Sequence, residues 1–234
     1  MFYEYGYVPG LSDFDRTGRL SYRSFFEALE NAGERHSAAA HDEIIDKSRG
    51  GLSWIITEWR LKINRRPERP EPLTVTTWTG GRIPSASVFR AFRMRDALND
   101  TVAEGEARLS VVDNVSGRLV RIDGALMEAY CPEQERIFAS EEKKPRPLSE
   151  YGDVRPCALR RSDVDFNGHV HNTAYIDLLF ELLPDGTELS EIRVAYLKPV
   201  RYGDSVTVGH SEENGTHFLC VFSGGVPCTV AEVR

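Results

Sequence analysis

The feature that most constrains the fold of this chain is an internal repeat. Residues Ser12–Leu20, SDFDRTGRL, align with Ser162–Val170, SDVDFNGHV, at a constant spacing of 150 positions. Each copy then runs into apolar residues at helical spacing. Because self-similarity at a fixed spacing marks a duplicated structural unit, we expect two related modules in one chain.

The residues after each copy predict one long helix per half. The apolar positions of the first helix are Tyr22, Phe25, Phe26 and Leu29; those of the second are Tyr175, Ile176, Leu179, Leu182 and Leu183. Turn-forming residues then favour an end to each helix, at Gly33 in the first half and at Pro184-Asp185-Gly186 in the second.

Strand-like segments follow both helices. Those of the first half are 54–63, 73–79, 88–95, 102–112 and 117–122, and those of the second are 191–197, 205–210, 216–223 and 226–233. A long helix wrapped by an antiparallel sheet, present twice, is an α+β fold of the tandem hotdog type. We expect an N-terminal hotdog at 1–130, a polar, proline-containing linker at 131–153 and a C-terminal hotdog at 154–234.

Composition excludes several classes of function. Polar residues interrupt every apolar run well short of the roughly 20 residues of a membrane span. The net charge of −7 argues against a nucleic-acid-binding protein. The first residues carry no secretory signal, and the four cysteines, Cys131, Cys157, Cys220 and Cys228, form no C-x-x-C pair, so we expect a cytoplasmic protein with reduced thiols.

No cofactor or metal is expected. The chain has neither a phosphate-binding G-x-x-x-x-G-K-[ST] loop nor a dinucleotide-binding G-x-G-x-x-G motif after a strand. His169 and His171 could share a face, but no cluster of cysteine or acidic residues completes a recognised metal-binding spacing.

The second copy of the repeat carries residues with catalytic chemistry. Asp165, Asn167 and His169 occupy alternate positions, so an extended segment would point a carboxylate, an amide and an imidazole to one side. The helix expected to begin at His171-Asn172 would add backbone N–H groups for a developing oxyanion. This combination suits hydrolysis of an acyl compound. Alternatively, the aspartates end a strand, Asn172 caps the helix and His169 is a buried structural residue.

These residues support a resemblance to a known family. The stretch Asp163–Ile176 resembles the active-site segment of the bacterial acyl-acyl carrier protein thioesterases. In the first half, Arg65-Arg66-Pro67 and Val75-Thr76-Thr77-Trp78 resemble that family's strand pair. The resemblance implies a tandem hotdog enzyme that releases free fatty acids from acyl carrier protein in fatty acid biosynthesis and needs no cofactor.

The resemblance also implies roles for individual residues. Asp165 matches the family's catalytic aspartate, which would act as a general base or as a nucleophile. Asn167 matches the asparagine that orients this aspartate or the thioester, and His169 matches the catalytic histidine. The N–H groups from Gly168 to Asn172 would bind the substrate oxyanion. Two departures stand out: His171 precedes Asn172 where the family often has two asparagines, and Pro199 occupies the position of a glutamate thought to assist water activation.

An acidic carrier protein would need a basic surface, and its acyl tail an apolar tunnel. The candidates for the surface are Arg60, Lys62, Arg65, Arg66 and Arg69, or Arg90, Arg93 and Arg95 along one strand face; those for the tunnel are Trp54, Trp59, Trp78, Phe89 and Phe92. The alternatives are a solvated sheet face and plain core packing.

Three other functions remain open at this point: an acyl-CoA thioesterase of the same fold, a catalytically decayed protein that binds acyl chains or the carrier, and, less favoured, a hotdog dehydratase. A monomer and a homodimer are both compatible with the sequence.

Overall fold

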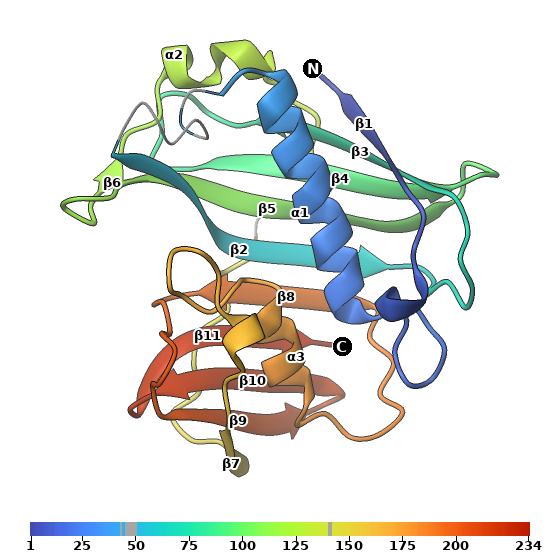
Figure 1. Ribbon diagram of the computed structural model, residues 1–234, viewed down its shortest axis with the longest axis vertical. Helices are drawn as coiled ribbons and strands as arrows, with labels where there is room; N and C mark the ends of the chain where they lie inside the picture. Colours follow the sequence, from blue (N-terminus) through green and yellow to red (C-terminus); the bar gives the residue numbers. More distant parts are fainter. Residues whose placement is uncertain (43, 45–50, 140–141) are drawn as a thin grey trace. The chain divides into compact units, whose positions relative to one another are not determined.

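The computed structural model describes residues 1–42, 44, 51–139 and 142–234 (Figure 1). The chain divides into two compact units. The first comprises Met1–Thr57 and Leu61–Glu141, and the second comprises Glu58–Arg60 and Glu142–Arg234. Within the described residues, no helix has the length and apolarity needed to cross a membrane.

The first unit is an antiparallel sheet with a long helix, α1 (Tyr22–Ala39), on one face (Figure 1). Its strands follow the order β1-β3-β4-β5-β2, and the two-residue β6 pairs with β5. Their bounds are β1 Tyr3–Tyr7, β2 Leu52–Ile63, β3 Leu73–Gly80, β4 Val88–Asp96, β5 Thr101–Asp113 and β6 Leu119–Val120. A single-turn helix, α2 (Gly124–Met127), follows β6.

The sequence explains where α1 begins and which face it buries. Ser21 is the N-cap, and its hydroxyl accepts the Ser24 N–H at 3.0 Å. Phe25, Phe26 and Leu29 have no exposed surface, as helical spacing on one face requires.

Gly33 does not end α1, contrary to the prediction, because the helix continues to Ala39. Its missing side chain instead admits Arg90 of β4. A Cβ at position 33 would lie 3.3 Å from Cδ and Nη1 of Arg90, and the guanidinium donates to the Gly33 carbonyl at 2.6 Å. The glycine therefore serves close packing between helix and sheet.

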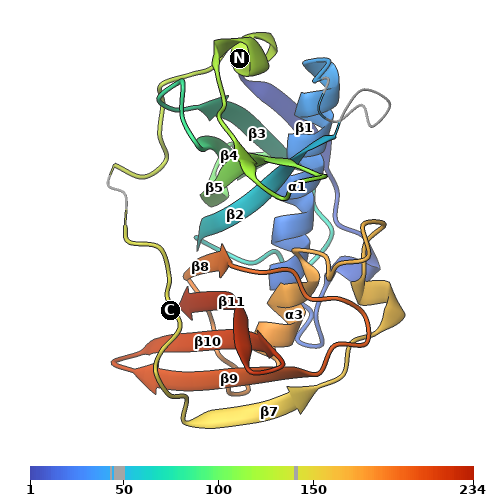
Figure 2. The ribbon, with the colours of Figure 1, turned by 90° about the vertical axis from the view of Figure 1, so that its left-hand side faces the viewer.

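The second unit repeats the arrangement with a shorter helix (Figure 2). Its strands follow the order β8-β11-β10-β9-β7, all antiparallel. Their bounds are β7 Asp153–Cys157, β8 Glu191–Tyr196, β9 Val206–Glu213, β10 Thr216–Ser223 and β11 Val226–Val233. The helix α3 (Ala174–Phe180) packs against β10.

The prediction of a long second helix was wrong. α3 has seven residues, and Leu182 and Leu183 lie beyond its end in a turn. Glu181 still has helical backbone angles, and the chain leaves the helix over residues 182–183, where Pro184 disfavours helical backbone at the residue before it. At the other end the N-cap is Thr173, not Asn172, and its side chain makes no capping hydrogen bond.

The start of the predicted linker is bound to the first unit. The Glu133 N–H donates to the Thr79 carbonyl at 2.8 Å, and the Trp78 indole donates to the Glu135 carbonyl at 2.8 Å. Gly80 makes this approach sterically feasible, since a Cβ there would lie 1.9 Å from the Glu133 oxygen.

Candidate functional site

The repeat forms a tight hairpin in the second unit, between a short 3-10 turn at Arg161–Asp163 and α3. Val164 and Val170 pair across its base. At its tip the Gly168 N–H donates to the Asp165 carbonyl at 3.0 Å, with Gly168 at a φ of +79°. A positive φ favours glycine, which explains this residue in the motif.

The hairpin brings Asp165 and Asn167 together. The Asp165 carboxylate accepts the backbone N–H of Asn167 at 2.8 Å, its side-chain amide at 3.2 Å and the backbone N–H of His169 at 3.2 Å. Three donors therefore orient one carboxylate at a half-buried position.

The extended segment predicted for these residues is not observed. A turn at 165–168 replaces it, and within the described residues His169 is hydrogen-bonded to Asp165 through its backbone and not through its imidazole. Among the described residues, the His169 imidazole makes no hydrogen bond, although it is half-buried and its residue pairs with Arg201 across a β-bridge.

Most backbone N–H groups assigned to an oxyanion site are already engaged. Gly168 donates to Asp165, Val170 to the Val200 carbonyl at 2.8 Å and His171 to the Asp163 carbonyl at 2.8 Å. The Asn172 N–H has no hydrogen-bond acceptor within the described part of the chain, and the Asn172 carbonyl accepts the Tyr196 hydroxyl at 3.0 Å. Of the expected group, the Asn172 N–H is thus the donor left for a substrate.

The first copy has the same backbone and different chemistry. Phe14 pairs with Leu20, and the Gly18 N–H donates to the Asp15 carbonyl at 2.9 Å, with Gly18 also at a φ of +79°. Here, however, Thr17 and Arg66 bind the Asp15 carboxylate. Burial alone would raise the pKa of Asp15, but the hydrogen bonds from Thr17 and Arg66 outweigh it and lower the pKa to about 2.

Pro199 occupies the place of Arg66 in the second copy. The Leu20 N–H donates to the Pro67 carbonyl, and the matching Val170 N–H donates to the Val200 carbonyl. Pro67 and Val200 therefore correspond, and so do the residues that precede them, Arg66 and Pro199. Within the described residues no cation pairs with Asp165. The duplication therefore contains one neutralised aspartate and one without a cationic partner, a difference that the aligned sequences alone did not reveal because Arg66 lies outside the repeat.

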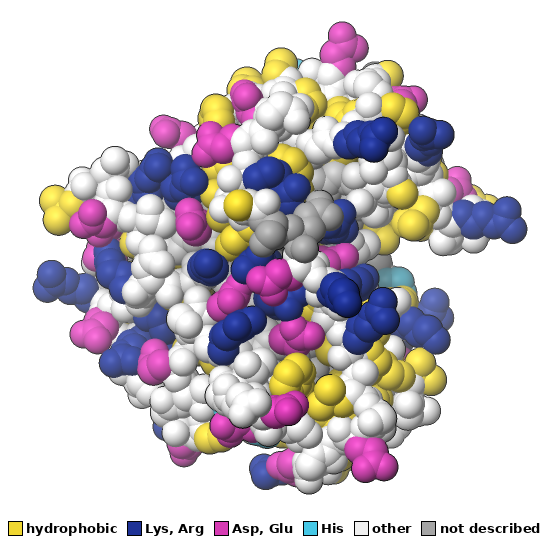
Figure 3. All heavy atoms as spheres, turned by 180° about the vertical axis from the view of Figure 1, so that it is seen from behind, with side chains coloured by type: hydrophobic (Ala, Val, Ile, Leu, Met, Phe, Trp, Pro, Cys, Tyr) yellow, Lys and Arg dark blue, Asp and Glu magenta, His cyan; other side chains and the backbone are white. Residues whose placement is uncertain are grey.

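Most of the basic residues predicted to form a docking surface do not form one. Arg90 is 5% exposed and faces α1, because its position has the opposite parity to Arg93 and Arg95. Arg60, Arg65 and Arg93 each pair with two carboxylates, and the Arg66 side chain is 6% exposed. On the face shown in Figure 3, Lys and Arg side chains are interspersed with Asp and Glu.

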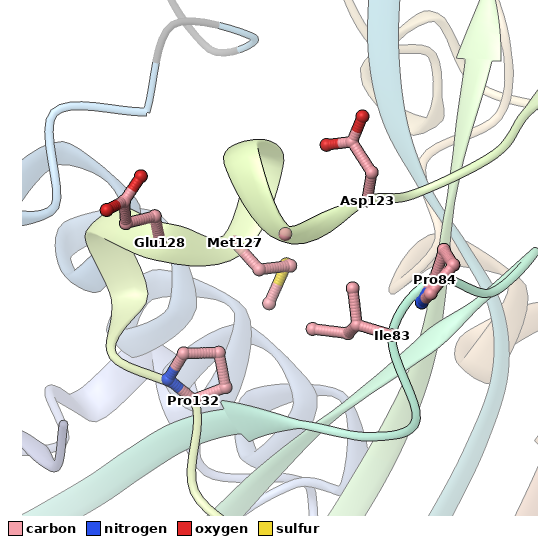
Figure 4. A pocket seen from close by; sticks show the side chains of 7 residues that line it. Ile83, Pro84, Asp123, Met127, Glu128 and Pro132 are labelled. Carbon is pink, nitrogen blue, oxygen red and sulfur yellow. The ribbon is translucent and has the colours of Figure 1, made fainter.

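The predicted tunnel aromatics belong mainly to the core. Trp59, Trp78 and Phe92 are each at most 2% exposed. An open cavity of about 490 Å³ in the first unit is lined by other residues: Ile83, Pro84, Asp123, Gly124, Met127, Glu128 and Pro132. In Figure 4, Ile83 and Met127 face each other, and the carboxylates of Asp123 and Glu128 point away from them.

The cysteines are free thiols and three are poor nucleophiles. Burial raises the pKa of Cys220 to about 12, and also raises the pKa of Cys157 and Cys228. No group of three or more potential metal ligands occurs among the residues that the structure describes.

Family models match both halves of the chain. The acyl-ACP thioesterase N-terminal domain matches residues 3–130, and the acyl-ACP thioesterase C-terminal domain matches residues 149–230. Oleoyl-acyl carrier protein thioesterase 1, chloroplastic, of Arabidopsis thaliana is 26% identical over 186 residues, which cover 71% of this chain and 51% of that protein. The chain spans about half the length of the curated relatives it matches.

Two solved structures share the fold. A 12:0-ACP thioesterase from Umbellularia californica has a TM-score of 0.88 at 17% identity, and the match covers 100% of this chain and 96% of that protein. An acyl-ACP thioesterase from Bacteroides thetaiotaomicron has a TM-score of 0.87 at 17% identity, and the match covers 99% of this chain and 96% of that protein. These similarities confirm the predicted tandem hotdog fold.

Proposed function

Because the chain belongs to the acyl-ACP thioesterase family, we propose that it hydrolyses fatty acyl thioesters of acyl carrier protein and releases free fatty acids. The observation that carries this proposal is the difference between the two copies of the repeat. Arg66 binds Asp15, whereas Asp165 has no cationic partner within the described residues and is oriented by Asn167 and the His169 backbone.

In the proposed reaction Asp165 acts as the general base. It takes a proton from water as the water oxygen adds to the thioester carbonyl. The C–S bond then breaks, the carrier thiolate leaves, and the proton held by Asp165 passes to the thiolate, which regenerates the carboxylate. Asn167 orients the carboxylate, His169 polarises the carbonyl, and the Asn172 N–H contributes to oxyanion binding near the hairpin of Gly168. Pro199 cannot supply a second base, so the scheme assigns water activation to Asp165 alone.

We further propose that the carrier protein is the partner and that the reaction takes place in the cytoplasm. Four free cysteines support a reducing compartment. A monomer or homodimer remains our prediction for the assembly, and sedimentation equilibrium would decide between them.

The test is thiol release from carrier-protein and CoA thioesters of the same acyl chains. We expect a kcat/KM that favours the carrier protein, and loss of turnover in both Asp165→Ala and His169→Ala. A preference for CoA would support an acyl-CoA thioesterase instead. Acyl binding without turnover would contradict hydrolysis and support a decayed binding protein.

A further inference from the structure

Four exposed cations surround the hairpin that carries Asp165. Arg160 and Arg161 precede it, and Lys198 and Arg201 lie in the chain segment that pairs with it. The Asp163 N–H donates to the Arg160 carbonyl at 3.1 Å, and Arg201 pairs with His169 across a β-bridge. We call these four residues the cationic rim.

The carboxylates near the cationic rim are bound to backbone. The Asp163 carboxylate accepts the Arg160 N–H at 2.7 Å, and the Asp204 carboxylate accepts the Arg201 N–H at 2.9 Å. Over the part of the chain that is described, no ion pair joins a rim side chain to a carboxylate. The four charges are thus exposed to solvent and available to a partner.

The first copy of the repeat provides an internal reference for these charges. Arg160 and Arg161 correspond to Gly10 and Leu11 at the spacing of 150. Arg201 corresponds to Glu68, because each follows the residue whose carbonyl accepts the matching hydrogen bond of its copy. Three cations in the second copy therefore stand where the first has two uncharged residues and one acid. The common backbone does not require this positive charge.

Two exposed aromatic side chains accompany the cationic rim. Phe166, at the tip of the hairpin, is 78% exposed, and Tyr202, next to Arg201, is 54% exposed. Arginine and large aromatic residues together are typical of protein interfaces, whereas a small anion would not cover such apolar surface.

We infer that the cationic rim docks an acidic surface of the carrier protein and so delivers its thioester to Asp165. This inference rests on the proposed function and assigns a surface to its partner. Opposite charge on the two partners would accelerate their encounter and make it dependent on salt. Phe166 and Tyr202 would add apolar contact beside the charges.

The test uses the full chain with Arg161→Glu/Arg201→Glu, and Arg146→Glu/Arg155→Glu as a control of equal charge change at exposed sites in the same unit. Three thioesters of one acyl chain are compared: the carrier protein, CoA and the neutral N-acetylcysteamine. At low salt we expect the rim variant to lose at least tenfold in kcat/KM for the carrier relative to the neutral thioester, mainly through KM. The control should lose less than threefold, and high salt should narrow the difference.

The docking surface would be overturned if the rim variant lost kcat/KM equally on the carrier and the neutral thioester. Equal losses of kcat/KM on the carrier in the rim variant and the control would also overturn it. A loss on CoA that matches the loss on the carrier would identify nucleotide phosphates as the ligand and also overturn it. If the wild type hydrolyses no carrier thioester, the proposed function fails. Binding of fluorescently labelled holo-carrier protein then tests whether the cationic rim is a docking surface. Weaker binding in the rim variant alone would support docking, and equal binding in all three proteins would contradict it.

Discussion

At the scale of single residues, the repeat shows how one backbone serves two roles. Asp15 and Asp165 close the same turn, but Arg66 neutralises only the first. The sequence predicted that Asp165 and Asn167 act together, and the structure brings their side chains to hydrogen-bond distance. The position of the His169 imidazole could not be predicted, because the alternation expected of a strand does not hold in a turn.

The Asp15–Arg66 pair should make stability depend on acid pH. The folded-state pKa of Asp15 is about 2, below its usual 3.8, so its contribution is present above pH 3.8 and is lost as pH falls towards 2. We expect Asp15→Asn to lose about 1–2 kcal/mol of unfolding free energy at pH 6. Urea denaturation from pH 6 to pH 2 would measure it. A loss that does not shrink towards pH 2 would contradict the assignment.

At the scale of elements, the sequence predicted long regular strands best. The observed bounds of β10 and β11 are those predicted, because both are apolar segments bounded by turns. Two edge strands were missed: β1 has only five residues, and β7 contains Pro156, which weakens a strand pattern. Gly33 was misread because local sequence does not show that Arg90 would pack against it.

Gly33→Ala should therefore not give the stability that this change usually gives in a helix. Its Cβ would press on Arg90 at 3.3 Å, which offsets a helix-propensity gain of up to about 1 kcal/mol. Gly124→Ala in α2 is the control, since a Cβ there meets nothing within 4 Å. Thermal unfolding should show no gain for Gly33→Ala and a small gain for Gly124→Ala. Equal gains would contradict tight packing at Gly33.

The helix α1 also carries a buried histidine that should destabilise the fold in acid. His36 is fully buried, neither ring nitrogen has a hydrogen-bond partner among the described residues, and its ring stacks on Tyr3 at 5.5 Å. Burial, with the nearby Arg90 charge and the N-terminal ammonium, lowers the pKa of His36 to about 3. Between pH 6.5 and 3 only the unfolded chain binds this proton, so stability falls as pH falls through that range.

His36→Phe keeps a ring and removes both unpaired nitrogens. We expect a gain of about 1 kcal/mol in unfolding free energy at pH 7 and roughly 2 kcal/mol more at pH 5. Chemical denaturation at the two pH values would measure both gains. A gain that does not depend on pH would show that His36 is not the titrating group.

At the scale of the whole molecule, the two halves and their order could be predicted because the repeat and the strand patterns agree. The boundary could not be placed as well. Residues 133–136 are polar and resemble a linker. Yet Arg136 forms an ion pair with Glu106 of β5 at 2.6 Å, and the Ile137 N–H donates to the same carboxylate at 2.7 Å. Such long-range contacts are not visible in composition.

The segment 142–152 has no helix or strand, but its start is held within the second unit, because Arg193 pairs with Glu142 and donates to the Lys143 carbonyl and Pro145 is buried. Limited trypsin digestion should cut first at the exposed Arg146, because cleavage needs accessible, locally unfolded backbone. Mass spectrometry of the first fragments would locate the cut. Earlier cleavage at Arg136 would contradict its attachment to β5.

The most direct test of the central claim, that the second copy performs the chemistry and the first is structural, compares kcat for thiol release in Asp165→Asn and Asp15→Asn. The same substitution is made at the same place in one backbone motif, and only Asp15→Asn also loses the pair with Arg66. We predict a loss of about a thousandfold for Asp165→Asn, from removal of the general base, and a change of less than threefold for Asp15→Asn at a temperature where it is folded. Equal losses in the two variants, or a larger loss for Asp15→Asn, would contradict the account.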